Sequence, residues 1–325
     1  MIRTTFTSRR ALLAGAVGGP LVMALGGCVG QSWDKLTGTS LSIATGNRGG
    51  VFDRYGNALA AVLEERLDGV TVTAHNTNAS LINLREVAQG TSDIGFALGD
   101  AAADAIRGTG PFADPVDLVA LTRTYDSFVH LVVTADSPVQ EVAHLRGRRV
   151  GLGSRGSGTR LVAGRILTAA GIASDEVTGT DDSLEQSADG LRRGRLDAFF
   201  FVSGIPNTAV TKLSESVPIR LVDLGTLLPE LTEAYGPEYT LGPVPTSSYG
   251  LPRAVDAVSV KNYLVVHPDL DEDLAYAVTR VMFEAQDRVD RISPQVRQPN
   301  LGAAIFTSPL PLHPGAERYY RERRQ

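Results

Sequence analysis

The hydrophobic and polar positions of the chain form one strand–turn–helix pattern, which occurs twice. In the first copy an apolar strand at 41–44 leads into a glycine-rich turn at 45–50. Apolar residues then recur at helical spacing as far as a second strand at 70–74. We expect Ser80 to be the N-cap of the next helix, which a third strand at 94–98 follows.

The second copy has the same order of elements. A strand at 149–152 is followed by a glycine-rich turn at 153–159 and a helix at 160–170. A weak strand at 177–180 follows, then a helix at 183–194 that Ser183 caps, and finally a buried strand at 198–202. In both copies an aspartate, Asp93 or Asp197, lies just before the last strand. Strands that alternate with helices predict an α/β fold with two lobes, each with a largely parallel sheet.

The first 27 residues have the pattern of an export signal. Arg3, Arg9 and Arg10 make a basic start, and the apolar stretch 11–25 is shorter than the ~20 residues that a spanning helix needs. The arginine pair resembles a twin-arginine signal, with an ordinary basic signal as the alternative. Leu-Gly-Gly before Cys28 resembles the lipobox of bacterial lipoproteins, in which the cysteine becomes the lipidated first residue of the mature chain. A buried core cysteine is the alternative.

Apolar runs outside the two copies suggest how the lobes are joined. We interpret the runs at 128–133 and 263–266 as hinge strands on which the chain crosses between the lobes. Helical spacing of apolar residues predicts a helix at 270–289. The resulting division begins with a signal segment at 1–27 and a polar tether at 28–40. The first lobe comprises 41–128 together with 265–325, and the second lobe comprises 129–264.

Composition narrows the class of protein. Hydrophobic residues make up 43% and charged residues 21% of the chain, which excludes a disordered chain, a collagen and a polytopic membrane protein. The formal net charge of −5 provides no basic field that would hold nucleic acid. The single cysteine excludes an intrachain disulfide and a cysteine-based zinc site.

The residues offer little for catalysis. The stretch 151–156 is a literal G-x-G-x-x-G after a strand, which would suit an exported oxidoreductase with a dinucleotide cofactor. However, Asp175, the acidic residue at the required spacing, lies in a turn or helix start rather than at a strand end. The chain has no G-x-S-x-G, no H-E-x-x-H and no P-loop, and its five histidines are isolated. We therefore expect no catalytic residue, no metal and no cofactor.

Binding accounts for both glycine-rich turns. A turn between a strand and a helix points free backbone N–H groups and the positive helix end at an anion. Two such turns on opposite sides of a cleft would hold a carboxylate, and nearby hydroxyl and amide groups would add donors: Asn47, Asn78, Ser80, Ser154, Ser157 and Thr159. The alternative is that these residues only make turns and caps, with Thr159 capping the helix that follows.

At these residues the sequence resembles the TAXI family, the solute-binding subunits of TRAP transporters. Five segments carry the resemblance in the family's order: the first glycine turn with the residues after it at 45–56, G-T-S-D-I-G at 90–95, G-S-G-T at 156–159, G-R-L-D-A-F-F at 194–200 with Ser203 beyond it, and L-H-P-G-A-E-R-Y-Y at 312–320. Together they span nearly the whole mature chain.

The resemblance implies a type II periplasmic-binding-protein-like fold, whose lobes close on a small organic acid such as an amino acid or a dicarboxylate like glutamate. It also implies a monomer that works with a TRAP-type membrane permease; a lipid-anchored sensor with the same fold is the alternative. The expected ligand-binding residues are Thr45, Gly46, Asn47, Gly50, Val51, Phe52, Asn78, Ser80, Ser154, Ser157, Gly158, Thr159 and Ser203. Departures from the family pattern are Phe52 for tyrosine, Leu98 for glutamine, and the added Arg48 and Arg155.

Overall fold

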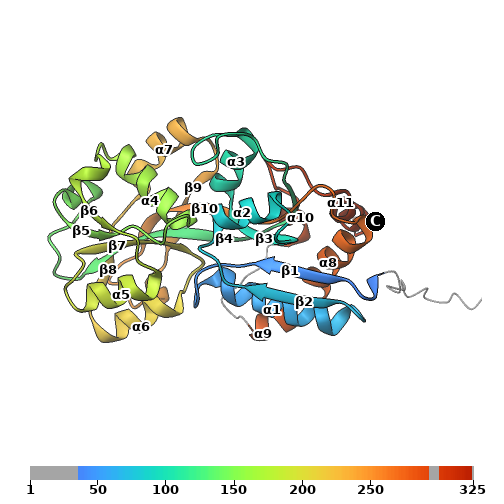
Figure 1. Ribbon diagram of the computed structural model, residues 1–325. Coiled ribbons are helices and arrows are strands. Elements are labelled where there is room, and N and C mark those ends of the chain that lie inside the picture. Colours follow the sequence, from blue (N-terminus) through green and yellow to red (C-terminus); the bar gives the residue numbers. More distant parts are fainter. Residues whose placement is uncertain (1–35, 293–299, 324–325) are drawn as a thin grey trace, which may run out of the picture. The chain divides into compact units, whose positions relative to one another are not determined.

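In the computed structural model, which describes residues 36–292 and 300–323, ten strands form one mixed sheet (Figure 1). The strands are β1 (Ser40–Ala44), β2 (Thr71–His75), β3 (Ile94–Leu98), β4 (Val119–Thr134), β5 (Arg149–Gly151), β6 (Thr178–Thr180), β7 (Ala198–Ser203), β8 (Ile219–Leu221), β9 (Tyr239–Val244) and β10 (Val255–Val266). Their order is β2-β1-β3-β10-β4-β7-β5-β6, with β8 beside β4 and β9 beside β10.

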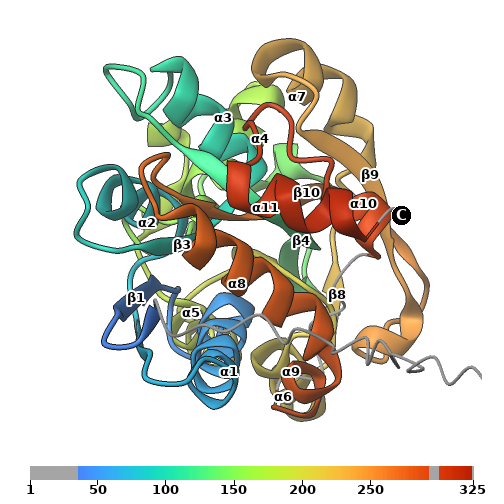
Figure 2. The ribbon, with the colours of Figure 1, turned by 90° about the vertical axis from the view of Figure 1, so that its right-hand side faces the viewer.

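Helices cover both faces of this sheet (Figure 1). They are α1 (Val51–Arg66), α2 (Ser80–Ala88), α3 (Gly99–Arg107), α4 (Gly158–Ala169), α5 (Leu184–Arg192), α6 (Thr208–Ser216), α7 (Leu228–Tyr235), α8 (Glu272–Glu284), α9 (Gln286–Ile292), α10 (Leu301–Ala304) and α11 (Pro314–Glu322). Helices α8 and α11 lie side by side over the half of the sheet that holds β1 (Figure 2). No helix in the described part of the chain is both long and apolar enough to cross a membrane.

Two parallel groups of strands face each other across an antiparallel centre. Strands β1, β2 and β3 are parallel, as are β5, β6 and β7, and each group contains one copy of the sequence pattern. Between them β4 and β10 run antiparallel to each other. The two apolar runs expected as hinge strands lie inside β4 and β10, and both strands are longer than those runs. The fold is therefore the expected two-lobed α/β type, but with one continuous mixed sheet.

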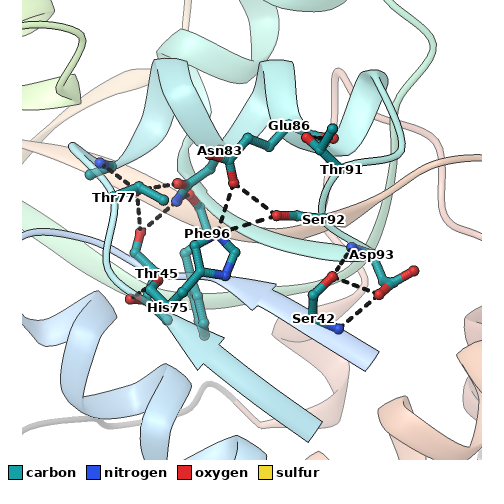
Figure 3. Close-up of polar contacts among 11 residues, drawn as sticks. Ser42, Thr45, His75, Thr77, Asn83, Glu86, Thr91, Ser92, Asp93 and Phe96 are labelled. Carbon is teal, nitrogen blue, oxygen red and sulfur yellow. Dashed lines mark hydrogen bonds and ion pairs between the residues drawn. The ribbon is translucent and has the colours of Figure 1, made fainter. Parts of the chain in front are cut away.

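The aspartate that recurs in both copies has the same structural role in each. The Asp93 carboxylate accepts a hydrogen bond from the backbone N–H of Ser42 at 2.7 Å (Figure 3). The Asp197 carboxylate accepts one from the backbone N–H of Arg149 at 2.8 Å. Each aspartate thus ties the turn before the last strand of its copy to the first strand, which explains the repeat without any binding role.

Close packing places the first helix against the end of the first strand. A Cβ atom at Gly56, in the middle of α1, would lie 2.2 Å from the Thr45 side chain. Tyr55 and Phe96 are fully buried at the same junction, with ring centroids 5.2 Å apart. Because Gly56 has no Cβ, α1 can pack directly against Thr45 at the end of β1.

The predicted helix caps and the predicted C-terminal helix agree with the structure only in part. Ser183 caps α5 as expected, accepting a hydrogen bond from the Gln186 backbone N–H. The prediction for Ser80 is wrong, because Ala79 is the N-cap of α2 and Ser80 is its first helical residue. The expected helix at 270–289 is divided at Ala285 into α8 and α9. The signal segment, Cys28 and the tether as far as residue 35 lie outside the described residues.

Candidate functional site

A cavity of about 40 Å³ lies where the carboxyl ends of both parallel groups face the central strands. In open α/β sheets, ligands bind in the crevice at such strand ends. The lining residues come from β1–α1, β3, β4, β7 and the starts of α2 and α4: Gly46, Asn47, Gly50, Val51, Phe52, Ala79, Ser80, Leu98, Tyr125, Ser127, Ser157, Gly158, Thr159, Phe201, Val202 and Ser203. The cavity therefore contains residues from both copies of the pattern.

Three helices begin at the cavity wall. Val51 and Phe52 open α1, Ser80 opens α2, and Gly158 and Thr159 open α4. The first N–H groups of a helix have no partner within it, and the helix dipole places positive potential there. Three such ends at one small cavity make it favourable for a negatively charged group.

A buried asparagine positions the two turns of the first lobe (Figure 3). The side-chain amide of Asn83 donates to the backbone carbonyls of Thr45 at 2.5 Å and Phe96 at 2.7 Å. Its Oδ1 accepts from the Thr77 hydroxyl, which itself accepts from the Ala79 N–H at 2.8 Å. Asn83 thereby ties the end of β1 and β3 to the start of α2. No sequence pattern indicates this role of Asn83, since a polar residue on a helix is usually exposed.

The second turn is fixed by its hydroxyl groups. Ser157 is the N-cap of α4 and accepts from the Arg160 N–H at 3.0 Å. The Thr159 hydroxyl accepts from the Val202 N–H at 3.3 Å and so joins α4 to β7. The alternative that Thr159 caps the helix is therefore wrong, because Ser157 has that position.

Most of the expected ligand-binding residues lie at this cavity. Ten of them line it: Gly46, Asn47, Gly50, Val51, Phe52, Ser80, Ser157, Gly158, Thr159 and Ser203. Thr45 is buried beneath the turn and donates its hydroxyl to the His75 carbonyl, and Asn78 is exposed. Ser154 donates to Asn47 Oδ1 at 3.1 Å, so it joins the two turns from outside the lining.

Other lining residues were not predicted as site residues. Tyr125 and Ser127 come from β4, just before the apolar run interpreted as a hinge strand, and Phe201 and Val202 come from a strand predicted only as buried. Leu98 was noted as a departure from the family pattern and not as a lining residue. The pairing of β4 with β7 brings these two strands together, and no local pattern encodes it.

The cavity wall is aromatic and carries no charged side chain among the described residues. Phe52 stacks on Phe96 with ring centroids 5.3 Å apart and meets the edge of Tyr125 at 6.2 Å. Burial holds the pKa of the Tyr125 phenol well above its usual value, so the phenol stays neutral. The two arginines of the turns point elsewhere: Arg48 is exposed, and Arg155 donates to Asp181 at 2.8 Å.

The positions of the described residues do not support a metal site or a dinucleotide-binding site. Within residues 36–292 and 300–323, no three or more histidine, cysteine, aspartate or glutamate residues gather as a metal site would need. Asp175 lies in a short 3₁₀ segment, Ser174–Glu176, and not at the end of a strand where a ribose would be bound.

The fold and the cleft define the chain as a two-lobed α/β protein of the periplasmic-binding-protein class. The chain belongs to the NMT1-like family, whose sequence pattern matches residues 43–323. Members of this family are solute-binding proteins rather than enzymes.

Solved structures with this fold are distant in sequence. PhnD1 from Prochlorococcus marinus in complex with methylphosphonate is 14% identical, with a TM-score of 0.54 over 89% of this chain and 99% of that one. A putative L-cystine ABC transporter protein from Listeria monocytogenes is 15% identical, with a TM-score of 0.50 over 79% and 95%. XAC2383 from Xanthomonas citri bound to ATP is 14% identical, with a TM-score of 0.50 over 87% and 95%. At this distance they show the shared fold.

Proposed function

We propose that the protein is an extracytoplasmic solute-binding protein that captures a small organic acid for a TRAP-type membrane permease. The convergence of three helix starts on one uncharged cavity is the observation that supports an acidic ligand. The five TAXI-like segments support the TRAP-type partner, because the family pattern appears in order across the chain.

The sequence before the fold supports a place outside the cytoplasm. A basic start and an apolar stretch precede Cys28, and Leu-Gly-Gly stands directly before it. We infer that Cys28 carries the lipid anchor that keeps the protein at the outer face of the cell membrane. A diacylated cysteine supplies two chains, which is what stable anchoring requires.

The test of the binding function uses Thr159→Val in the mature domain. The substitution keeps the shape of the side chain and removes its hydroxyl. A hydrogen bond to a charged acceptor contributes about 1.5–3 kcal/mol, so affinity for the acid should fall roughly 10- to 100-fold. Isothermal titration calorimetry with a panel of carboxylates measures this loss, and Ser157→Ala should show a loss of the same order.

The matched control is Thr168→Val on the same helix, where the hydroxyl is exposed and donates to the Gly164 carbonyl. Thermal melts of all three variants check that each is folded. Thr168→Val should bind as the wild type does. Equal affinities for Thr159→Val, Ser157→Ala and the wild type would remove the second turn from the site.

A further inference from the structure

Three buried hydroxyl groups at the cavity have hydrogen atoms without an acceptor. Ser80, Ser157 and Ser203 are 0%, 2% and 3% exposed, and all three line the cavity. Each hydroxyl oxygen accepts one hydrogen bond, from Leu98 N at 3.1 Å, Arg160 N at 3.0 Å and Asn207 Nδ2 at 3.5 Å respectively. None of the three donates to an acceptor within residues 36–292 and 300–323. A serine hydroxyl has one donor, so three donors remain for a ligand.

The backbone around these serines adds donors of the same kind. The N–H groups at the starts of α1 and α4 are unpaired by helix geometry, and those of Val51, Phe52, Gly158 and Thr159 belong to lining residues. The cavity thus presents many donors in a small volume. A ligand group with several lone pairs and no hydrogen to donate fits this arrangement, as a carboxylate or sulfonate does.

The two acidic residues that are adjacent in the chain to lining residues, Asp53 and Asp126, are already engaged. Asp53 follows Phe52 in the chain, and its two oxygens accept from the Gly49 N–H at 2.8 Å and from the side-chain amides of Asn57 and Asn76. Asp126 lies between Tyr125 and Ser127, and its carboxylate is bound by Arg123 at 2.7 Å. No carboxylate in the described lining is available to an ammonium group.

We propose that the ligand is a small organic anion without an amino group, which narrows the organic acids of the proposed function and rests on it. An ammonium group in this cavity would be buried without a carboxylate partner, which is strongly unfavourable. The remaining walls are apolar, with Phe52, Leu98 and Phe201 among them, which suits an uncharged tail. α-Amino acids, glutamate included, are therefore excluded as the main ligands.

The test compares acids with amino acids that have the same carbon skeleton. The pairs are propionate with alanine, butyrate with 4-aminobutyrate, phenylacetate with phenylglycine, and ethanesulfonate with taurine. Calorimetry on the mature wild-type domain at neutral pH should give affinities at least about 10-fold higher for the member without the amine, because an unpaired buried donor costs about that much or more. The sulfonate pair shows whether a tetrahedral head group is accepted as well as a planar one.

The outcomes separate this proposal from the one on which it rests. Equal or tighter binding of the amine-containing members would overturn the amine-free assignment and leave the organic-acid function standing. If neither member of any pair bound, the anion site itself would be refuted. Preference for the acids in at least one pair supports both.

A pair of variants at Ser203 gives a second measurement. Ser203→Asp places a carboxylate at the wall, whereas Ser203→Asn has a similar shape without the charge. After thermal melts confirm folding, Ser203→Asp should lose its preference for the acids, and Ser203→Asn should keep it. An unchanged preference in folded Ser203→Asp would show that this wall does not face the ligand and would overturn the assignment.

Discussion

At the residue scale, a buried histidine connects the core of the second lobe to the cavity wall. His130 is fully buried, and its Nδ1 lies 2.8 Å from the Phe128 carbonyl, to which it donates. Its Nε2 then accepts from the Tyr249 hydroxyl at 3.0 Å, and that hydroxyl accepts from the Asn207 N–H at 2.9 Å. Asn207 also donates to Ser203 in the cavity wall. The arrangement requires a neutral imidazole.

We expect His130 to make stability depend on pH. Burial lowers the pKa of this imidazole to about 4 from 6.5. As pH falls below 6.5, the His130 imidazole therefore becomes protonated in the unfolded chain but stays neutral in the folded chain. The stabilisation is fully present above pH 6.5, declines between 6.5 and about 4, and the loss of about 3 kcal/mol is complete below that. Urea unfolding at a series of pH values measures the decline.

The comparison variant is His130→Gln, which removes the titrating group. Its free energy of unfolding should fall less steeply between pH 6.5 and 4 than that of the wild type, whatever its absolute stability. His144→Gln, at an exposed position, is the control and should keep the wild-type slope. Parallel curves for His130→Gln and the wild type would mean that the buried imidazole is not linked to folding.

The roles of some single residues could be predicted from the sequence, and those of others could not. Ser183 was correctly predicted as a cap because serine three residues before glutamine is a complete local signal. Ser80 lacks this signal, since Asn83 stands three residues after it, and Ala79, with a positive φ of 72°, is the cap instead. Asn83 acts through the carbonyls of Thr45 and Phe96, which are close only in the folded chain.

At the scale of elements, a buried charge cluster joins α3 to α4. Arg165 of α4 is 6% exposed and contacts Asp100 and Asp104 of α3. It also donates to the Tyr239 hydroxyl at 3.0 Å and lies 4.5 Å from the centre of the Tyr235 ring. Burial raises the pKa of Asp104, which the charge of Arg165 opposes. Helix α3 directly follows β3 of the first copy, and α4 lies in the second copy, so this cluster links the two groups of strands from one face.

Arg165→Met should therefore destabilise the protein strongly. Removing one member of a buried ion pair leaves the others uncompensated and costs about 3–5 kcal/mol. The control is Arg149→Met at the half-exposed pair with Asp197, where the loss should stay within about 1 kcal/mol. Urea unfolding at neutral pH compares the two variants. Similar losses in both would contradict the role of burial in this cluster.

Elements were predictable from sequence where their cause is local. The repeated strand–turn–helix pattern located β1 with α1 and β5 with α4, and even the weak strand at 177–180 is present as β6. The lengths and antiparallel pairing of β4 and β10 were not predicted, because they follow from contacts between distant segments. Part of the cavity was missed for the same reason, as Tyr125 and Ser127 reach it along β4.

At the scale of the whole described fold, two hydrogen bonds join the first glycine-rich turn and α1 to segments that follow β4. Ser154 donates to Asn47, which joins the two glycine-rich turns. Arg54 of α1 donates to the Thr208 hydroxyl at the start of α6 at 2.8 Å. The loss of both contacts would favour an open arrangement about β4 and β10.

We expect the double variant Ser154→Ala, Arg54→Met to bind ligand roughly 10-fold more weakly. Each lost hydrogen bond removes about 1 kcal/mol from the closed arrangement, and a lower closed population lowers the apparent affinity. Small-angle scattering should show a larger radius of gyration without ligand and a larger decrease when ligand is added. Arg66→Met, exposed at the far end of α1, is the control. Superimposable scattering curves for all samples would argue against closure about these strands.

The path of the chain through the sheet also sets the order in which the protein can fold as it is synthesised. Strand β3 has β10 as its neighbour, and α8 and α11, which cover the first strands, follow β10 in the chain. Strands β5 to β9, in contrast, find their partners among β4, each other and the first part of β10. The later half can therefore complete its ladder first. The first three strands leave the ribosome earliest, but β3 keeps an open edge until β10 has been synthesised.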